Sequence, residues 1–421
     1  MKMEKEKNVR FLALRSLLAI EKDRRYSNLE VDASLCRSEL SPLDRALYTA
    51  LVYAAVERKI TLDYLISLFS SRDRIEREVR MILRLGLVQL FFLDKIPPHA
   101  AVDESVSLCR LVGKGSAASF VNAVLRSALR EKEKIVYPTE KKENLSVRFS
   151  VSPDVASLFL GQFGFDRAEK LFEAMNGHPY PTLRVNTLRT TPESLAAKVG
   201  GEVVGHAVRL LSPKPLSGLD CLGNGEAFVQ DLSSGESVEI FDPRPGERIL
   251  DACACPGGKS FAAAILMKNE GKIVSCDLHA NKLSLVSRGA ALLGLSCIEP
   301  TEADASFFHP DWENAFDRVL CDVPCSGLGV LAKKPDIRYK EEKDFVRLPA
   351  IQGAILQNCA RYVRSGGFLQ YSTCTLNRKE NEEVTSRFLS EEKAFEKIEE
   401  KTFFPDTDFS DGFYLCKMKK K

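Results

Sequence analysis

Two cysteines in the second half of the chain follow strands of a predicted sheet. Cys325 comes after Arg318–Asp322, in the sequence DVPCSG, and Cys374 comes after Gly367–Ser372, in YSTCT. The carboxyl ends of parallel strands meet at one edge of a sheet, where such folds hold ligands and reacting groups. A lone cysteine at that edge would indicate a buried thiol. A pair of them indicates covalent catalysis, because a thiolate is a strong nucleophile.

Two charged residues accompany the cysteines. Asp322 ends the strand before Cys325, and Lys259 opens the helix after the first predicted strand. A lysine cation favours the thiolate or orients a carboxylate. Burial raises the pKa of a carboxyl group, which suits it to proton transfer near neutral pH. We therefore predict one catalytic group, made of Cys374, Cys325, Asp322 and Lys259.

A glycine-rich turn at the same edge predicts a nucleoside cofactor. The sequence ILDACACPGGK joins the first strand to its helix, and it is neither a GxGxxG loop nor a Walker loop. Asp277 ends the second strand, where a carboxylate can accept from both ribose hydroxyls. Asp304, in TEADAS, follows a third strand that lies between Ile273–Cys276 and the fourth strand, Arg318–Asp322, and is within reach of an adenine edge. The predicted cofactor site contains Cys253, Ala254, Cys255, Pro256, Gly257, Gly258, Lys259, Asp277, Asp304 and Asp322.

From Gly223 onward, the predicted strands that position these residues alternate with predicted helices. This alternation is typical of a doubly wound α/β domain with a parallel sheet. Its predicted strands are Arg248–Asp251, Ile273–Cys276, Arg318–Asp322 and Gly367–Ser372. Its predicted helices are Lys259–Met267, Ala280–Leu293, Asp344–Val363 and Lys379–Leu389.

The first half of the chain has a different pattern. Apolar residues recur every three or four positions from Asn8 to about Lys134, which predicts an all-helical domain, and Ser41 before Pro42 predicts a helix start. A predicted helix over Asp154–Met175 and a short strand at Leu183–Asn186 indicate a small α/β module. We predict three domains, at residues 1–140, 141–222 and 223–421.

Composition narrows the class of protein. The chain has 421 residues, of which 44% are apolar and 28% charged, as in globular multidomain proteins. No uncharged apolar stretch is long enough to span a bilayer and no signal peptide is recognisable, so we expect a cytoplasmic protein without a membrane partner. Residues 1–222 hold 34 Lys and Arg against 27 Asp and Glu, a mild excess that a nucleic-acid surface and an ordinary solvated surface explain equally well.

The twelve cysteines indicate reduced thiols rather than a disulfide framework. The sequence contains no C-x-x-C pair, and none of its five histidines adjoins a cysteine. We therefore expect no metal site.

Three motifs resemble a known family. CACPGGKS, DVPCSGLGVLAKKPDIR and YSTCTLNRKENEEV are similar to the motifs of RNA cytosine carbon-5 methyltransferases that use S-adenosylmethionine. LSPLDRALYTALVYAAVERK, KIPPHAAVDESV and FVNAVLR resemble the helical domain shared with the antitermination factor NusB. Together they resemble the bacterial small-subunit ribosomal RNA methyltransferase B family over nearly the whole chain, although Cys255 stands where alanine is commoner.

This resemblance implies the chemistry. Cys374 would add to carbon 6 of a cytosine, Cys325 would help release the product, and Asp322 would hydrogen-bond ring nitrogen 3 or the exocyclic amine. The residues alone leave the order of the cysteines open, because DNA carbon-5 enzymes attack from a Pro-Cys. The implied partners are S-adenosylmethionine and small-subunit ribosomal RNA, with the target base single-stranded or flipped out. We expect a monomer with RNA-binding amino-terminal modules.

Three alternatives stay open at this point. An amino-group methyltransferase would carry an aromatic residue in its fourth-strand motif, where this chain has Asp-Val-Pro-Cys. The same chemistry could act on transfer RNA. A non-catalytic RNA-binding or antitermination adaptor is the third alternative, and its catalytic groups would usually have been lost.

Overall fold

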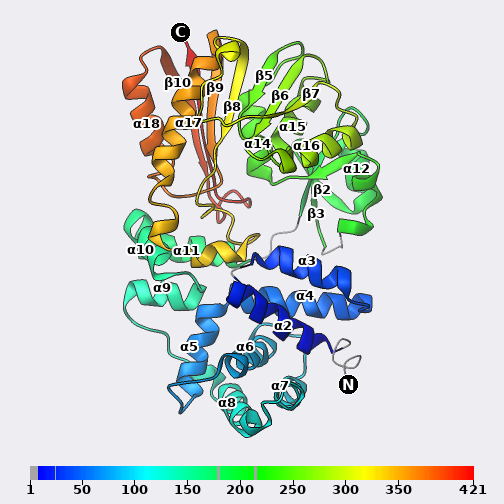
Figure 1. The fold of residues 1–421 in the computed structure, drawn as a ribbon, viewed down its shortest axis with the longest axis vertical. Coiled ribbons are helices and arrows are strands. Elements are labelled where there is room, and N and C mark those ends of the chain that lie inside the picture. The colour runs from blue at the N-terminus through cyan, green and yellow to red at the C-terminus, as the bar shows by residue number, and fades with distance from the viewer. Residues whose placement is uncertain (1–7, 24, 178–180, 213–215) are drawn as a thin grey trace. The chain divides into compact units, whose positions relative to one another are not determined.

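The computed structural model describes residues 8–23, 25–177, 181–212 and 216–421. The chain forms two compact units (Figure 1). The first contains Met1–Glu169 and Lys333–Glu341, and the second contains Lys170–Ala332 and Glu342–Lys421. The Pro213–Pro215 segment lies outside the described residues. None of the helices in the described ranges is long and apolar enough to cross a membrane.

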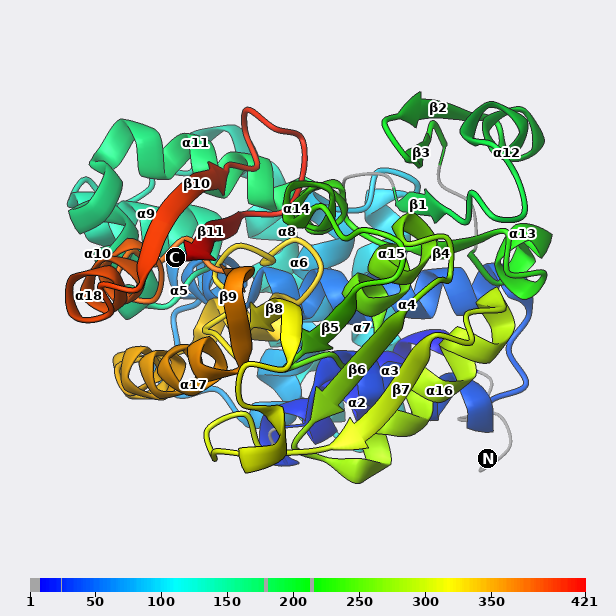
Figure 2. The same ribbon diagram turned by 90° about the horizontal axis from the view of Figure 1, so that it is seen from above.

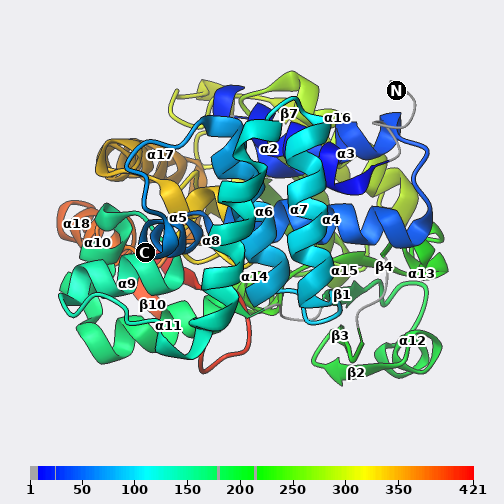
Figure 3. The same ribbon diagram turned by 90° about the horizontal axis from the view of Figure 1, so that it is seen from below.

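The first unit is all-helical, as predicted. Ser41 caps α4 (Pro42–Glu57) by accepting a hydrogen bond from Asp44 N at 3.2 Å, which confirms the predicted helix start at Pro42. Figure 3 shows α6, α7 and α8 packed together around the apolar core. The helices are α2 (Val9–Asp23), α3 (Ser27–Arg37), α4 (Pro42–Glu57), α5 (Lys59–Phe69), α6 (Arg77–Phe91), α7 (Pro98–Leu111), α8 (Ala118–Arg130), α9 (Lys141–Phe149) and α10 (Pro153–Phe163).

The single helix predicted over Asp154–Met175 is wrong. The segment forms two helices, α10 and α11 (Phe165–Asn176), separated by Gly164. Gly164 has φ of 74°, a left-handed conformation that glycine adopts without strain and that ends a helix.

A segment from the second half of the chain completes the first unit. Residues 335–339 form a short 3₁₀ helix, η5 (Pro335–Tyr339), that packs against α4. Asp336 accepts hydrogen bonds from the buried Ser27 at the start of α3, with 2.7 Å between Ser27 Oγ and Oδ2. Arg338 is 2% exposed and donates to the Phe149 carbonyl at 3.0 Å. The helical unit is therefore built from two distant parts of the sequence.

The second unit begins with a four-stranded antiparallel sheet of order β2-β3-β1-β4. The predicted strand at Leu183–Asn186 is observed as β1. The pattern did not predict the three short strands that pair around it. The elements here are β1 (Thr182–Val185), α12 (Pro192–Val199), β2 (Gly201–Val204), β3 (Ala207–Leu210), α13 (Asp220–Gly223) and β4 (Ala227–Val229).

A seven-stranded sheet of order β10-β11-β9-β8-β5-β6-β7 forms the rest of the second unit. The five strands β9-β8-β5-β6-β7 are parallel, which confirms the doubly wound class. The remaining two strands, β10 and β11, were not predicted, and β11 runs antiparallel to both β9 and β10. The strands are β5 (Arg248–Asp251), β6 (Lys272–Asp277), β7 (Ile298–Glu302), β8 (Phe316–Asp322), β9 (Val363–Thr373), β10 (Phe395–Phe403) and β11 (Phe413–Lys420).

Helices cover both faces of this sheet, as Figure 2 shows for α17 on one side and α14 and α15 on the other. Adjacent residues of β5 point to opposite faces, because Leu250 belongs to the core under α17 and Ile249 to the core under α14 and α15. The helices are α14 (Leu232–Phe241), α15 (Gly258–Leu266), α16 (Ala280–Leu293), α17 (Leu348–Tyr362) and α18 (Glu382–Glu391).

Replacing Asp336 should destabilise the first unit. Asp336→Ala leaves the buried backbone N–H and hydroxyl of Ser27 without their acceptor, which costs roughly 1 to 2 kcal/mol. We expect a lower thermal midpoint of the helical signal in the full-length chain. Asp336→Asn keeps one acceptor oxygen and should lie between wild type and alanine. Equal midpoints for all three proteins would show that η5 does not support α3.

Candidate functional site

The two cysteines predicted from the strand ends lie in contact. Their Sγ atoms are 3.3 Å apart, and neither cysteine is in a disulfide. The register explains this contact, because Asp322 of β8 pairs with Ser372 of β9 and each cysteine follows within three residues. The two loops therefore leave neighbouring strands at the same level of the sheet.

The contact affects the ionisation of the thiols. The hydrogen bond with Cys374, followed by burial, raises the pKa of Cys325 well above its usual range. Either sulfur can be the donor in this contact.

A partly buried ion pair adjoins the thiols. Lys259 Nζ lies 2.7 Å from Asp322 Oδ2, and Ser372 Oγ donates to Asp322 Oδ1 at 2.8 Å. Burial by itself lowers the pKa of Lys259, but the Asp322 carboxylate outweighs burial and raises it overall. The Cys374 sulfur contributes to the same rise, so Lys259 is a persistent cation close to the thiol. The structure thus brings together the four residues predicted as the catalytic group.

The glycine-rich turn joins β5 to α15 next to this group. Gly257 has φ of 113°, and a Cβ there would lie 2.4 Å from the Phe261 ring, so only glycine fits. At the base of the turn, Asp251 is 1% exposed and its Oδ2 accepts from Ser260 Oγ at 2.6 Å. Its Oδ1 has no hydrogen-bond partner among the described residues. Asp251 is not among the predicted site residues, although its position at the end of β5 was an available signal.

The two acids predicted to bind a nucleoside end adjacent strands. Asp277 ends β6, is 14% exposed, and accepts from His279 N at 2.9 Å. Asp304 follows β7 and accepts from Ser306 N at 2.8 Å. Ala303 N donates to the Asp277 carbonyl at 3.2 Å, which ties the two segments together. Burial, followed by the charge of Asp277, raises the pKa of Cys255 to about 12, so this thiol stays neutral.

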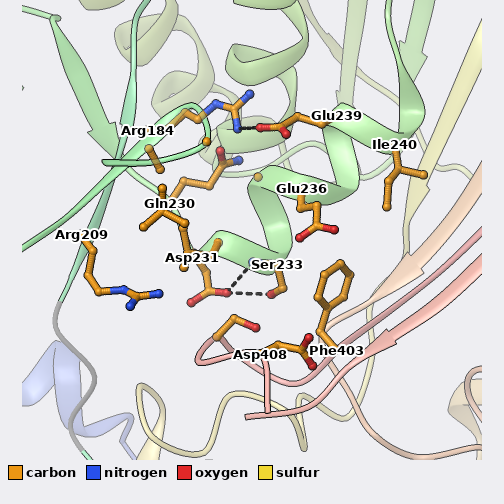
Figure 4. Close-up of a pocket in the computed structure, with 16 residues that line it drawn as sticks. Arg184, Arg209, Gln230, Asp231, Ser233, Glu236, Glu239, Ile240, Phe403 and Asp408 are labelled. Carbon is orange, nitrogen blue, oxygen red and sulfur yellow. Dashed lines mark hydrogen bonds and ion pairs between the residues drawn. The ribbon is translucent and has the colours of Figure 1, made fainter. Parts of the chain in front are cut away.

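A cavity of about 530 Å³ is lined by the four-stranded sheet, α14 and the segment before β11 (Figure 4). Gln230 connects it to the glycine-rich turn, because its Nε2 donates to the Gly258 carbonyl at 3.1 Å. Arg184, 3% exposed, donates to Glu239 at 2.6 Å. Two buried atoms in the lining, Arg184 Nε and Gln230 Oε1, have no partner among the described residues. This cavity was not predicted, since its lining comes from four separated segments.

The described part of the chain contains no cluster of three or more His, Cys, Asp or Glu side chains that could hold a metal ion. Its polar site residues are instead paired with one another, as Lys259 and Asp322 are.

Two family models match the chain. One, described as 16S rRNA methyltransferase RsmB/F, matches residues 238–419, and the other, the NusB family, matches residues 7–130. The Bacillus subtilis protein named "Probable ribosomal RNA small subunit methyltransferase B" is 37% identical, covering 99% of this chain and 100% of the relative. A Synechocystis protein of the same name is 33% identical, covering 98% and 99%.

A solved structure shares the fold. The methyltransferase homologue protein from Pyrococcus horikoshii aligns with a TM-score of 0.60 and 24% identity, covering 68% of this chain and 100% of that one. At this identity the likeness shows the fold alone.

The buried Asp251 should make stability fall with rising pH. Burial raises its pKa from 3.8 to about 6, so the folded chain holds a proton that the unfolded chain releases earlier. In acid, this proton stabilises the folded chain by roughly 3 kcal/mol. The stabilisation is lost as the pH rises from near 3.8 to about 6.

The Asp251→Asn variant keeps the acceptor for Ser260 and cannot ionise. Calorimetric midpoints measured between pH 4 and 6 should therefore change less with pH than those of wild type. Asp311→Asn, which removes an exposed carboxylate, serves as the control. Identical pH profiles for Asp251→Asn and wild type would show that Asp251 does not carry this proton.

Proposed function

The chain belongs to the 16S rRNA methyltransferase RsmB/F family, and from that premise we propose that it methylates carbon 5 of a cytosine in small-subunit ribosomal RNA with S-adenosylmethionine. The observation that carries this proposal is the 3.3 Å contact between Cys325 and Cys374 beside the Lys259–Asp322 ion pair. A family of RNA methyltransferases fits this group, because methylation at an aromatic carbon needs a covalent activator and a base.

Carbon 5 of cytosine is a poor nucleophile. Addition of a thiolate to carbon 6 forms a carbon–sulfur bond and makes carbon 5 part of an enamine, which can attack an electrophilic methyl group. Carbon 5 then loses its proton to a base, the carbon 5–carbon 6 double bond re-forms, and the thiolate leaves. One cysteine adds, and a second group at the same place assists the elimination.

We assign the addition to Cys374 and the release to Cys325. The Lys259 cation near Cys374 supports this order, because a nearby cation favours the thiolate. Asp322 is assigned to ring nitrogen 3 or the exocyclic amine of the base, where charge builds as sulfur adds. Lys259 holds the Asp322 side chain in place at 2.7 Å.

The residues around the glycine-rich turn fit S-adenosylmethionine, which supplies an electrophilic methyl group on a sulfonium. Asp277, near the end of β6, is assigned to the ribose hydroxyls and Asp304 to the adenine edge. The unpartnered Oδ1 of Asp251 suits a cationic amine, since a buried carboxylate oxygen needs a donor. The turn itself supplies the rest of the proposed contacts, from Cys253, Ala254, Cys255, Pro256, Gly257 and Gly258.

The RNA must present its target base outside a helix, because a stacked cytosine cannot offer carbon 6 to sulfur. We assign the positioning of the surrounding RNA to residues 1–140 and 141–222. The cavity beside the four-stranded sheet suits a polar ligand, because charged side chains such as Arg209 and Asp231 line it.

Cofactor affinity should depend on Asp277. Asp277→Ala removes the acceptor for two ribose hydroxyls, at a cost of roughly 1 to 3 kcal/mol, so calorimetry should show S-adenosylmethionine binding about tenfold weaker or more. Glu299→Ala, an exposed position on the neighbouring β7, is the matched control and should bind normally. Wild-type affinity in Asp277→Ala would remove Asp277 from the cofactor site.

The two cysteines should fail differently when replaced. Cys374→Ala should form neither methylated RNA nor a covalent complex, because the nucleophile is absent. Cys325→Ala should add to the base and transfer the methyl group but stall in elimination, so protein should stay on RNA through denaturing electrophoresis.

The reverse pattern would assign the attack to Cys325. Full methylation by both variants would show that neither cysteine takes part in covalent catalysis. Replacing Cys359, a buried thiol on α17, controls for the general loss of a cysteine and should leave methylation intact.

A further inference from the structure

Glu380 is a fully buried carboxylate for which the reaction assigns no role. It is 0% exposed, and none of the described residues forms an ion pair with it. An unpaired buried carboxylate is costly unless hydrogen bonds satisfy both oxygens. The structure supplies those bonds from three donors.

The donors come from the loops that carry the two cysteines. Glu380 Oε2 accepts from Ser326 N at 2.8 Å, next to Cys325, and Oε1 accepts from Asn377 Nδ2 at 2.9 Å, in the segment after Cys374. Oε2 also accepts from Gln352 Nε2 of α17 at 3.0 Å. One carboxylate therefore joins both loops to a helix beneath them.

The same network holds the chain on the other side of Cys325. Gln352 Nε2 donates to the Pro324 carbonyl at 3.0 Å, so the residues before and after this cysteine are both fixed. Ser326 Oγ and Thr375 Oγ1 lie 2.7 Å apart, which links the neighbours of the two cysteines directly.

We propose that Glu380 is a positioning residue that sets the contact between Cys325 and Cys374 by tying their loops together. This inference rests on the proposed function for its importance to methylation, but the positioning itself can be measured without RNA. All three partners donate, so the group between them must accept at both oxygens. An amide at this position would place an NH₂ group against a donor.

The charge of Glu380 adds to the geometry. It contributes to the raised pKa of Cys325, after the hydrogen bond with Cys374 and burial. Glu380 thus favours the proton on Cys325 in addition to holding that sulfur near Cys374.

Three proteins test the proposal. Glu380→Gln removes one acceptor and the charge with little change of size, and Glu380→Asp keeps the charge on a shorter side chain. Glu247→Gln is the matched control, because Glu247 also accepts from two donors, Arg318 Nε at 2.7 Å and Arg244 N at 2.8 Å, at the opposite ends of the strands.

The first readout is the rate at which oxidised glutathione forms a Cys325–Cys374 disulfide. Mass spectrometry of the joined peptides measures this rate. The two thiols lose two electrons and two protons, and one glutathione disulfide becomes two glutathione thiols. The disulfide should close fast in wild type and in Glu247→Gln. In Glu380→Gln it should close at least about tenfold more slowly, and Glu380→Asp should lie between them.

The second readout is steady-state methylation. In Glu380→Gln we expect kcat to fall about tenfold or more with KM for RNA and S-adenosylmethionine affinity nearly unchanged, and the pH profile of kcat to shift. Wild-type closure rates in Glu380→Gln would overturn the proposal. If Glu380→Gln does not fold, the same comparison made with Glu380→Asp decides the proposal, and a wild-type closure rate there overturns it.

Failure of the proposed covalent mechanism can be told apart from failure of the positioning role of Glu380. If Cys374→Ala still methylates RNA, the proposed covalent mechanism is wrong, yet the closure rate continues to report whether Glu380 positions the thiols.

Discussion

The parallel pairing of β8 and β9 is the constraint on which the candidate site depends. Asp322 and Ser372 are register partners, so a slip of two residues along either strand would separate the loops that carry Cys325 and Cys374 by about 7 Å. Gly329, in the loop after β8, packs closely against the segment before β11, because a Cβ there would lie 2.0 Å from the Gly412 carbonyl oxygen. Its N–H donates to the Cys374 carbonyl at 3.1 Å, which closes the loop after β8 onto the loop after β9.

Partial burial of opposite charges gives this edge its electrostatic character. Lys259 and Asp322 are expensive to remove from water, and their 2.7 Å contact compensates only because Ser372 also donates to the carboxylate. The cation then lies near the thiols, while Glu380 is a buried anion on the side of Cys325. The two sulfurs thus experience different fields although they touch, which is how two identical side chains can take different parts in one reaction.

Local sequence patterns predicted the helices and strands whose own residues carry a clear apolar periodicity. β5 and α16 have the predicted bounds, and the fold class is confirmed. The helix predicted over Lys379–Leu389 begins later, at Glu382, and Glu380 lies before it, where its side chain accepts hydrogen bonds from the cysteine loops. β10 was missed because FEKIEEKTF is mostly charged and exposed and is a strand only through pairing with β11. The incorporation of residues 333–341 into the helical unit depends on contacts more than 180 residues apart, such as Arg338 with Phe149.

The site was predictable by type and place, but not by geometry. Strand ends placed Cys325, Cys374, Asp277 and Asp304 at one edge, whereas spacing could not give the 3.3 Å sulfur contact or the Glu380 network. The three domain ranges and the roles of the site residues remain predictions.

The measurement that tests the central claim most directly is the mapping of a trapped adduct. RNA carrying 5-fluorocytidine offers no proton at carbon 5 after methyl transfer, so elimination cannot occur and the protein should stay bound through the attacking sulfur. Digestion and mass spectrometry of wild-type protein should place the modified nucleotide on the peptide containing Cys374. A nucleotide on the peptide containing Cys325, or no adduct with an RNA that is otherwise methylated, would contradict the account.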